Sequence, residues 1–217
     1  MALPLLVIGN KNYSSWSLRP WLALKQAGYA FEELRISLDT AETRAQILTH
    51  SPSGKVPVLI DGGLRIWESL AICEYVAEQL PEAGLWPADP AVRAVARSVS
   101  CEMHAGFAAL RAGMPMDTRA RHTGWPMSPA VMDDIDRIAN LWRCCRMQYG
   151  GGGDFLFGRF TIADAMYAPV VTRFMTYGVL LDEDLGRYCQ ALLALAPFQQ
   201  WLEAARQEPE TLAVLRP

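Results

Sequence analysis

The chain has 217 residues, and 51% of them are hydrophobic, which excludes a disordered polymer. Its net charge of −3 argues against nucleic acid as the main partner. It contains no apolar run approaching the roughly 18 to 20 residues that a membrane span needs. Its five cysteines form no CxxC or metal-ligand pattern. We therefore expect reduced thiols, no metal, no membrane partner and a cytoplasmic location.

Predicted strands and helices alternate through the N-terminal part of the chain. In order, they are strand Leu3–Ile8, a helix from the serine cluster Ser14–Ser17 to Gly28, strand Phe31–Leu38, helix Ala41–Leu48, a strand from Lys55 to Ile60, strand Leu64–Trp67 and helix Glu68–Leu80. Asp39 with Glu42 predicts a capping box for the second helix. Pro20 is expected in the first turn of the first helix, where a missing N–H is tolerated.

The stretch around Pro57 is the most informative part of the sequence. Proline gives no N–H to a strand ladder, so Pro57 is expected at the beginning of its strand. If the Val56–Pro57 bond is cis, the backbone of Val56 faces outward and can pair with an extended peptide as one strand pairs with another. Glu68 and Ser69 follow at a helix N-terminus, where free N–H groups and the helix dipole favour a carboxylate. The sequence therefore predicts a peptide-binding edge beside an anion pocket.

The order of elements predicts two domains. A right-handed crossover makes the first two strands parallel, and the final hairpin completes a mixed four-stranded sheet with three helices. Residues 81–90 contain three prolines and a glycine, which indicates a linker. We expect an α/β domain over residues 1–80, a linker over 81–90 and an all-α domain over 91–217.

The C-terminal part contains only helical patterns. The predicted helices are Ala91–Met114, Ala130–Tyr149, Thr161–Tyr177, Asp184–Leu195 and Phe198–Gln207. A loop at Pro115–Pro129 separates the first two. Thr161 and Asp164 form a second predicted capping box, to which we assign a role in folding.

Three groups of residues resemble motifs of the cytosolic glutathione S-transferase superfamily. They are Lys55-Val56-Pro57, Glu68-Ser69-Leu70-Ala71-Ile72 with Glu74-Tyr75, and Ser14-Ser15-Trp16-Ser17. The chain is most similar to the serine-type zeta class, whose first loop reads Ser-Ser-Cys-Ser, and Trp16 stands where that class has cysteine. The resemblance implies a thioredoxin-like N-terminal domain that binds glutathione as co-substrate. It also implies a helical domain that supplies a second-substrate pocket, and a homodimer.

The resemblance implies that a hydroxyl group of the first loop contacts the glutathione thiol. A free thiol has a pKa of about 8.5 and is mostly protonated at neutral pH, so the enzyme must stabilise the thiolate. Ser14 is the first candidate donor, Ser15 the second and Tyr13 the third. The alternative interpretation is that both serines only cap the helix.

The remaining glutathione contacts follow from the same resemblance. Val56, next to Pro57, would pair with the cysteinyl backbone. Glu68 would bind the γ-glutamyl amine, Ser69 the γ-glutamyl carboxylate and Lys55 the glycyl carboxylate. The alternatives are an ordinary strand residue, a capped first turn and a solvated lysine.

Candidates for the second-substrate pocket are Trp16, His104 and Arg111. His104 and Arg111 lie seven positions apart on one predicted helix and would share a face. A lone histidine on an apolar helix is, however, more often a core or surface residue. Arg19 either raises the positive potential near the sulfur or forms a salt bridge. Trp16, Met116 and Trp125 could add an apolar wall to this pocket, but packing in the core is the default expectation for them.

The leading prediction is a glutathione transferase that activates the glutathione thiol for attack on a small apolar electrophile. Alternatives are a glutathione-dependent isomerase of the maleylacetoacetate isomerase kind, a peroxidase and a non-catalytic glutathione-binding module. A thioredoxin-type thiol–disulfide oxidoreductase is disfavoured because residues 9–20 contain no cysteine.

Overall fold

The N-terminal part folds as a four-stranded sheet with three helices. The computed structural model describes residues 2–122 and 124–212. Its first elements are β1 (Leu5–Ile8), α1 (Ser15–Gln26), β2 (Glu32–Arg35), α2 (Thr43–His50), β3 (Val58–Asp61), β4 (Leu64–Trp67) and α3 (Ser69–Gln79). The strand order is β2-β1-β3-β4, with β1 and β2 parallel and the other pairs antiparallel. The predicted mixed thioredoxin-like sheet is confirmed.

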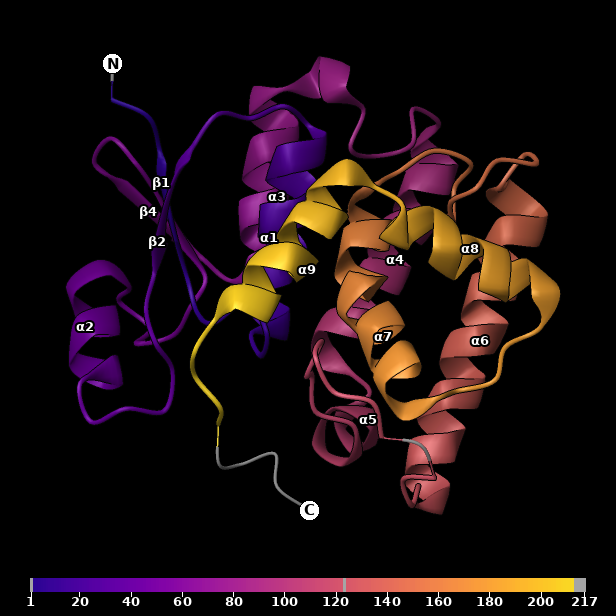
Figure 1. Cartoon of the computed structure of the whole chain (residues 1–217). Helices are drawn as coiled ribbons and strands as arrows, with labels where there is room; N and C mark the ends of the chain where they lie inside the picture. The colour runs from indigo at the N-terminus through magenta and orange to yellow at the C-terminus, as the bar shows by residue number, and fades with distance from the viewer. Residues whose placement is uncertain (1, 123, 213–217) are drawn as a thin grey trace.

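Helices cover both faces of this sheet, with α2 on one side and α1 and α3 on the other (Figure 1). The cause is the two-residue period of a strand, which sends alternate side chains to opposite faces. In β1, Val7 packs in the cluster of Ile36, Ile47 and Val58 on the α2 side. Leu6 and Ile8 belong instead to the large core that α1 and α3 share with the helical part.

The C-terminal part is helical throughout the described residues. A short 3-10 helix, η1 (Pro81–Ala83), leads to α4 (Pro90–Ala105), α5 (Ala108–Gly113), α6 (Pro129–Tyr149), α7 (Ile162–Tyr177), α8 (Glu183–Leu193) and α9 (Ala196–Gln207). Helix α7 is buried along nearly its whole length. It packs against α1 and α4. No helix among the described residues is long and apolar enough to cross a membrane.

The predicted helix over 91–114 is wrong as a single element. It breaks after Ala105, and Phe107 takes a left-handed backbone with φ of 58° before α5 begins. Gly106 lies at the break, where an added Cβ would meet the carbonyl oxygen of Glu102 at 2.8 Å. The chain therefore needs a glycine at this point to pack as it does. Gly106 in the sequence could have indicated this break in the predicted helix.

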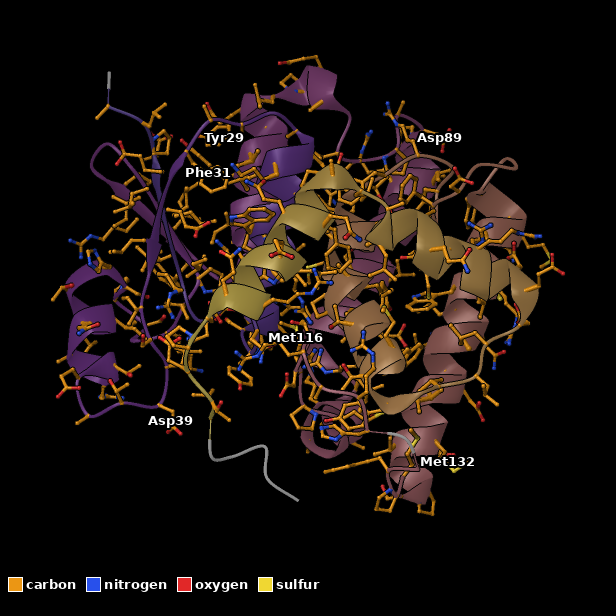
Figure 2. All side chains as sticks on the ribbon, in the orientation of Figure 1. Tyr29, Phe31, Asp39, Asp89, Met116 and Met132 are labelled. Atoms are coloured by element: carbon orange, nitrogen blue, oxygen red, sulfur yellow. The ribbon has the colours of Figure 1, made fainter. Side chains whose placement is uncertain are left out.

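The predicted start of the second helix also differs from the structure. Helix α2 begins at Thr43, and its cap residue Glu42 makes no side-chain capping bond. Asp39 lies in the loop before α2 (Figure 2) with φ of 60°, so the predicted Asp39–Glu42 capping box is wrong. The N–H of Thr40 instead donates to Thr43 Oγ1 at 2.9 Å.

Pro20 lies in the second turn of α1, because that helix begins at Ser15. The prediction of a first-turn proline is therefore wrong by one turn. Since proline has no N–H, α1 lacks the bond that position 20 would otherwise give to the carbonyl of Trp16.

The capping box at the start of α7 is confirmed. Thr161 and Asp164 bond reciprocally, with the Thr161 N–H donating to Asp164 Oδ2 at 2.8 Å. Asp164 is fully buried and also accepts from the N–H of Leu156 at 3.1 Å. This carboxylate ties the preceding loop to the central helix of the second domain. The proposed linker 81–90 covers η1 and the chain up to the first residue of α4.

Candidate functional site

A cavity of about 470 Å³ opens where the loop before β3, the N-terminus of α3 and the end of α4 meet. It lies between the sheet domain and the helical domain. Its lining residues are Trp16, Ser53, Lys55, Val56, Pro57, Glu68, Ser69, His104 and Ala105. The cavity thus brings together all five residues that we predicted to bind glutathione and two of the three predicted for the second substrate.

Val56 and Pro57 form one wall of the cavity. The peptide bond between them is cis. The Val56 side chain packs against the α2-facing cluster of the sheet. Val56 itself precedes Val58, the first paired residue of β3. The strand ladder of β3 therefore begins just beyond the cavity.

Glu68 and Ser69 form the opposite wall, at the start of α3. Glu68 has φ of 72°, a left-handed conformation that non-glycine residues rarely adopt and that is often found at functional sites. Ser69 is fully buried, and its hydroxyl has no hydrogen-bond partner among the described residues. A buried unpaired hydroxyl beside the free N–H groups of a helix N-terminus is suited to bind a carboxylate.

The serine cluster lies at the N-terminus of α1, directly before Trp16. Ser14 is the N-cap of α1: its Oγ accepts from the N–H of Ser17 at 3.4 Å and donates to Ser17 Oγ at 2.7 Å. Ser15 is only 7% exposed, and its hydroxyl makes no hydrogen bond within the described residues. Neither serine lines the cavity. Ser14 therefore caps α1, whereas the Ser15 hydroxyl has no partner among the described residues.

Tyr13, the third candidate donor, points to a different partner. Its hydroxyl accepts a hydrogen bond from Arg119 Nη2 at 2.9 Å. That arginine also bonds to backbone carbonyls near the C-terminal end of the chain. Tyr13 is therefore held by the loop between α5 and α6.

Trp16 is surrounded by cationic side chains. The guanidinium carbons of Arg19 and Arg111 lie 4.2 and 4.7 Å from the centre of its ring. The His104 ring meets it edge-on, with centroids 5.3 Å apart. His104 Nε2 also lies 3.5 Å from the carboxylate of Glu68, so the two proposed subsites are adjacent. Burial lowers the pKa of His104, the nearby Arg19 lowers it further, and Glu68 opposes both effects.

Arg111 reaches Trp16 by a route that the sequence analysis did not predict. Because the helix breaks at Gly106, His104 and Arg111 do not share a helix face. Instead, the Arg111 guanidinium turns back and bonds to carbonyl oxygens at the end of α4. It donates to Gly106 at 3.0 Å, to His104 at 3.2 Å and to Met103. Arg111 does not line the cavity. Its guanidinium caps the C-terminal end of α4 by bonding to carbonyl oxygens there.

Arg19 is fully buried, and none of its three guanidinium nitrogens has a hydrogen-bond partner among the described residues. The predicted salt bridge is therefore wrong, since no described acidic side chain pairs with it. Burial lowers its pKa well below the usual value, and Arg111 and Arg173 lower it further. Arg173 is itself buried, with a pKa lowered by burial to about 10. Arg19 and its neighbours Arg111 and Arg173 thus form a cluster of basic side chains next to Trp16.

Some residues differ from their predicted roles or were not predicted at all. Ser53 and Ala105 line the cavity, and only the loop position of Ser53 could have suggested this. Met116 is in the core, as expected by default, and Figure 2 labels it near the middle of the molecule. Trp125 packs against His122 and Tyr177 away from the cavity. Within the described part of the chain, no cluster of three His, Cys, Asp or Glu side chains could hold a metal.

The fold and the cavity define a two-domain protein, with a thioredoxin-like domain joined to an all-helical domain around a shared cleft. Models of the N-terminal and C-terminal domains of glutathione S-transferase match residues 13–79 and 102–204. The chain therefore belongs to the glutathione S-transferase family, which confirms the resemblance found in the sequence. It is a glutathione-dependent enzyme of the transferase or isomerase type.

Individual relatives agree with this assignment. Rat maleylacetoacetate isomerase is 27% identical over 217 residues, covering 98% of this chain and 97% of that protein. A probable maleylacetoacetate isomerase of Caenorhabditis elegans is 36% identical over 104 residues, 48% of each chain. A glutathione transferase homologue from Burkholderia, solved with bound glutathione, has a TM-score of 0.70 at 22% identity, covering 94% of this chain and 97% of that one. The tau class enzyme of mango gives 0.72 at 20% identity, with 94% and 96% covered.

Proposed function

We propose that this enzyme binds glutathione in the cavity between Val56 and Ser69 and activates its thiol for attack on a small apolar electrophile. The single observation that carries the proposal is the convergence of Val56, Glu68 and Ser69 on one cavity. An extended tripeptide laid along Val56 would have its cysteinyl backbone paired like a strand. Its γ-glutamyl carboxylate would meet the Ser69 hydroxyl and the α3 N-terminus. Glu68 would hold the amine, and the exposed Lys55 the glycyl carboxylate.

The thiol would then lie toward the N-terminus of α1. A hydroxyl donor there stabilises the thiolate and lowers the thiol pKa by one unit for each ~1.4 kcal/mol of stabilisation. Ser14 remains our first assignment, and Ser15 is the alternative with the free hydroxyl. The N-terminal dipole of α1 favours the same negative charge.

The electrophile would enter next to Trp16 and His104. The indole ring supplies an apolar wall, which supports a small, largely apolar substrate. Arg111 would act through its contact with Trp16, because Nε and Nη2 of its guanidinium bond to carbonyl oxygens at the end of α4.

Glutathione-dependent isomerisation is the second candidate function. The full-length match to rat maleylacetoacetate isomerase favours it. Trp16, which stands at the cysteine position of the zeta-class loop, argues for a different second substrate. Activity with a cis-enone acid, measured beside conjugation of a chloronitrobenzene, separates the two functions.

The direct test pairs retention on immobilised glutathione with a conjugation assay. We expect the protein to be retained, to turn over chloronitrobenzene and to lose retention in Ser69→Ala and Glu68→Gln. Exposed Glu82→Gln is the matched control, since it changes an acidic residue outside the cavity. Retention without turnover across a panel of electrophiles would identify a non-catalytic binding module instead. We further propose a cytoplasmic homodimer, as is common in this family.

A further inference from the structure

The loop that leads into the serine cluster is held by the C-terminal end of the chain. This loop connects β1 to α1 and makes only a tight turn of its own, in which the N–H of Ser14 donates to the Asn10 carbonyl at 2.8 Å. The N–H groups of Lys11 and Asn12 find no acceptor in that turn. They donate to the two oxygens of one carboxylate, Glu208, at 2.6 and 3.0 Å.

Glu208 is built into this position. Glu208 is only 8% exposed, although it follows the last helix of the described chain. Both of its carboxylate oxygens accept hydrogen bonds from N–H groups of the loop. The nearest cationic atom is Arg35 Nη1, at 3.9 Å from Oε1. Two consecutive N–H groups on one buried carboxylate fix the local backbone more tightly than a neutral acceptor would, because charge-assisted hydrogen bonds are shorter and stronger.

The opposite side of the same loop is held as well. The fully buried Asn12 side chain donates to Asp117 at 2.8 Å and accepts from the Thr118 hydroxyl at 2.8 Å. Arg119 then joins the two sides, since it donates to the Tyr13 hydroxyl and, at 2.6 Å each, to the carbonyls of Glu208 and Glu210. Asn12 therefore lies between two fixed segments, only two residues before Ser14.

We propose that Glu208 is a positioning residue for thiol activation: by holding the Lys11 and Asn12 N–H groups, it sets the orientation of Ser14 and Ser15 toward the glutathione sulfur. This proposal rests on the proposed function, because it needs a hydroxyl donor in the serine cluster. Small displacements of a catalytic group have large effects on rate, since hydrogen-bond geometry decides how well the group stabilises the reacting atom. Glu208 itself does not line the cavity.

The test compares Glu208→Gln with Glu210→Gln. The amide of Glu208→Gln keeps the shape but turns an NH₂ group toward one of the two loop N–H groups. Glu210 anchors the same segment through Arg35 and Ser37 but does not touch the loop, so it is the matched control. The measurements are kcat and KM for glutathione in conjugation, the pH profile of kcat/KM, glutathione affinity by calorimetry and the thermal midpoint.

For Glu208→Gln we expect kcat to fall about tenfold and the acidic limb of the kcat/KM profile to move to higher pH. Glutathione affinity should stay within about threefold of the original, because Val56, Glu68 and Ser69 come from another segment. Glu210→Gln should keep its kcat and its pH profile. An unchanged kcat and profile in Glu208→Gln overturns the proposal, as does an equal loss in Glu210→Gln. A loss of Glu208→Gln activity that only follows the unfolded fraction also overturns it. Failure of the unchanged enzyme to bind glutathione overturns the proposed function first.

Discussion

Ser14 and Ser15 differ in how their hydroxyl groups are used, and this difference allows their roles to be separated. Ser14 caps α1, so Ser14→Ala should destabilise the protein by about 1 kcal/mol in addition to any loss of kcat. Ser15 makes no such bond, so Ser15→Ala should leave the unfolding free energy within about 0.5 kcal/mol. We expect at least one of the two variants to lower kcat by about 100-fold.

Chemical denaturation and conjugation kinetics of both variants check this prediction. Unchanged turnover in both would show that neither hydroxyl contacts the sulfur. A backbone N–H or Tyr13 would then become the candidate donor.

The buried charge of Arg19 should lower the stability of the fold but favour ionisation of the bound thiol. Its charge is buried with no described counter-ion, on the same helix as the serine cluster. Replacing an unpaired buried charge by an apolar side chain of similar length removes a desolvation penalty, so Arg19→Met should be at least as stable as the original. The loss of positive charge should raise the pKa of the bound thiol by about one unit.

The pH dependence of kcat/KM tests this, because its acidic limb reports thiolate formation. The limb should move to higher pH in Arg19→Met and stay in place in the exposed control Arg97→Met. A limb that does not move, or an unfolded Arg19→Met, contradicts this account of the buried charge.

The sequence was most informative where function depends on adjacent residues. Val56, Pro57, Glu68 and Ser69 lie in two short motifs, and the cavity contains all of them. The position of Arg111 was not predictable in the same way. That position depends on the helix break at Gly106, and on the hydrogen bonds that the Arg111 guanidinium donates to carbonyl oxygens at the end of α4.

Asp164 determines how the start of α7 responds to pH. Burial raises the pKa of Asp164 to about 6, although N–H donors from Leu156 and Thr161 and the Thr161 hydroxyl favour its ionised form. A carboxyl group in an unfolded chain titrates near pH 4. Between these two values the native state binds more protons than the unfolded state. The resulting stabilisation is present below about pH 4 and is lost as the pH rises through about 6.

Comparison with Asp164→Asn isolates this effect from other titrating groups. The unfolding free energy of the original protein minus that of the variant should fall by up to about 3 kcal/mol from pH 4 to pH 7. Asp164→Ala, which removes the cap, should destabilise by about 1 kcal/mol or more and leave glutathione affinity unchanged. Denaturant titrations at the two pH values provide the measurement. A constant or growing difference would contradict the raised pKa.

At the scale of elements, the sequence predicted the regular segments better than their ends. Apolar patterns and turn residues predicted each strand, but the paired part of β2 is shorter than the predicted Phe31–Leu38. The ends depend on pairing partners and caps that come from elsewhere in the fold. The capping box of α7 was found because both of its residues are local, whereas α2 starts without one.

The assembly of the whole molecule can be tested through β4, an edge strand of the described sheet. Leu64 and Trp67 on this strand are 49% and 45% exposed, which leaves apolar surface available for a second subunit. The proposed homodimer should have about twice the 24.1 kDa mass of the chain in light scattering. Trp67→Glu should shift the distribution toward monomer, and Met147→Glu, an exposed residue on α6, provides a surface control. A mass near that of one chain for the original protein would exclude the dimer.

The overall architecture could be predicted from the order of strands and helices. The contacts that hold the loop between β1 and α1 could not. The bond between Asn12 and Glu208 joins residues 196 positions apart. No periodicity or motif indicates such a pair, because both ends lie outside regular structure. The position of the C-terminal segment beside the serine cluster could therefore be seen only in the folded chain.

The most direct test of the whole account is a crystal structure with bound glutathione. We predict that the tripeptide lies extended in the cavity, with its cysteinyl backbone paired to Val56 and its γ-glutamyl carboxylate on Ser69. The sulfur should lie within hydrogen-bond distance of the Ser14 or Ser15 hydroxyl. Glutathione bound elsewhere, or in this cavity with its sulfur turned away from α1, would contradict the account.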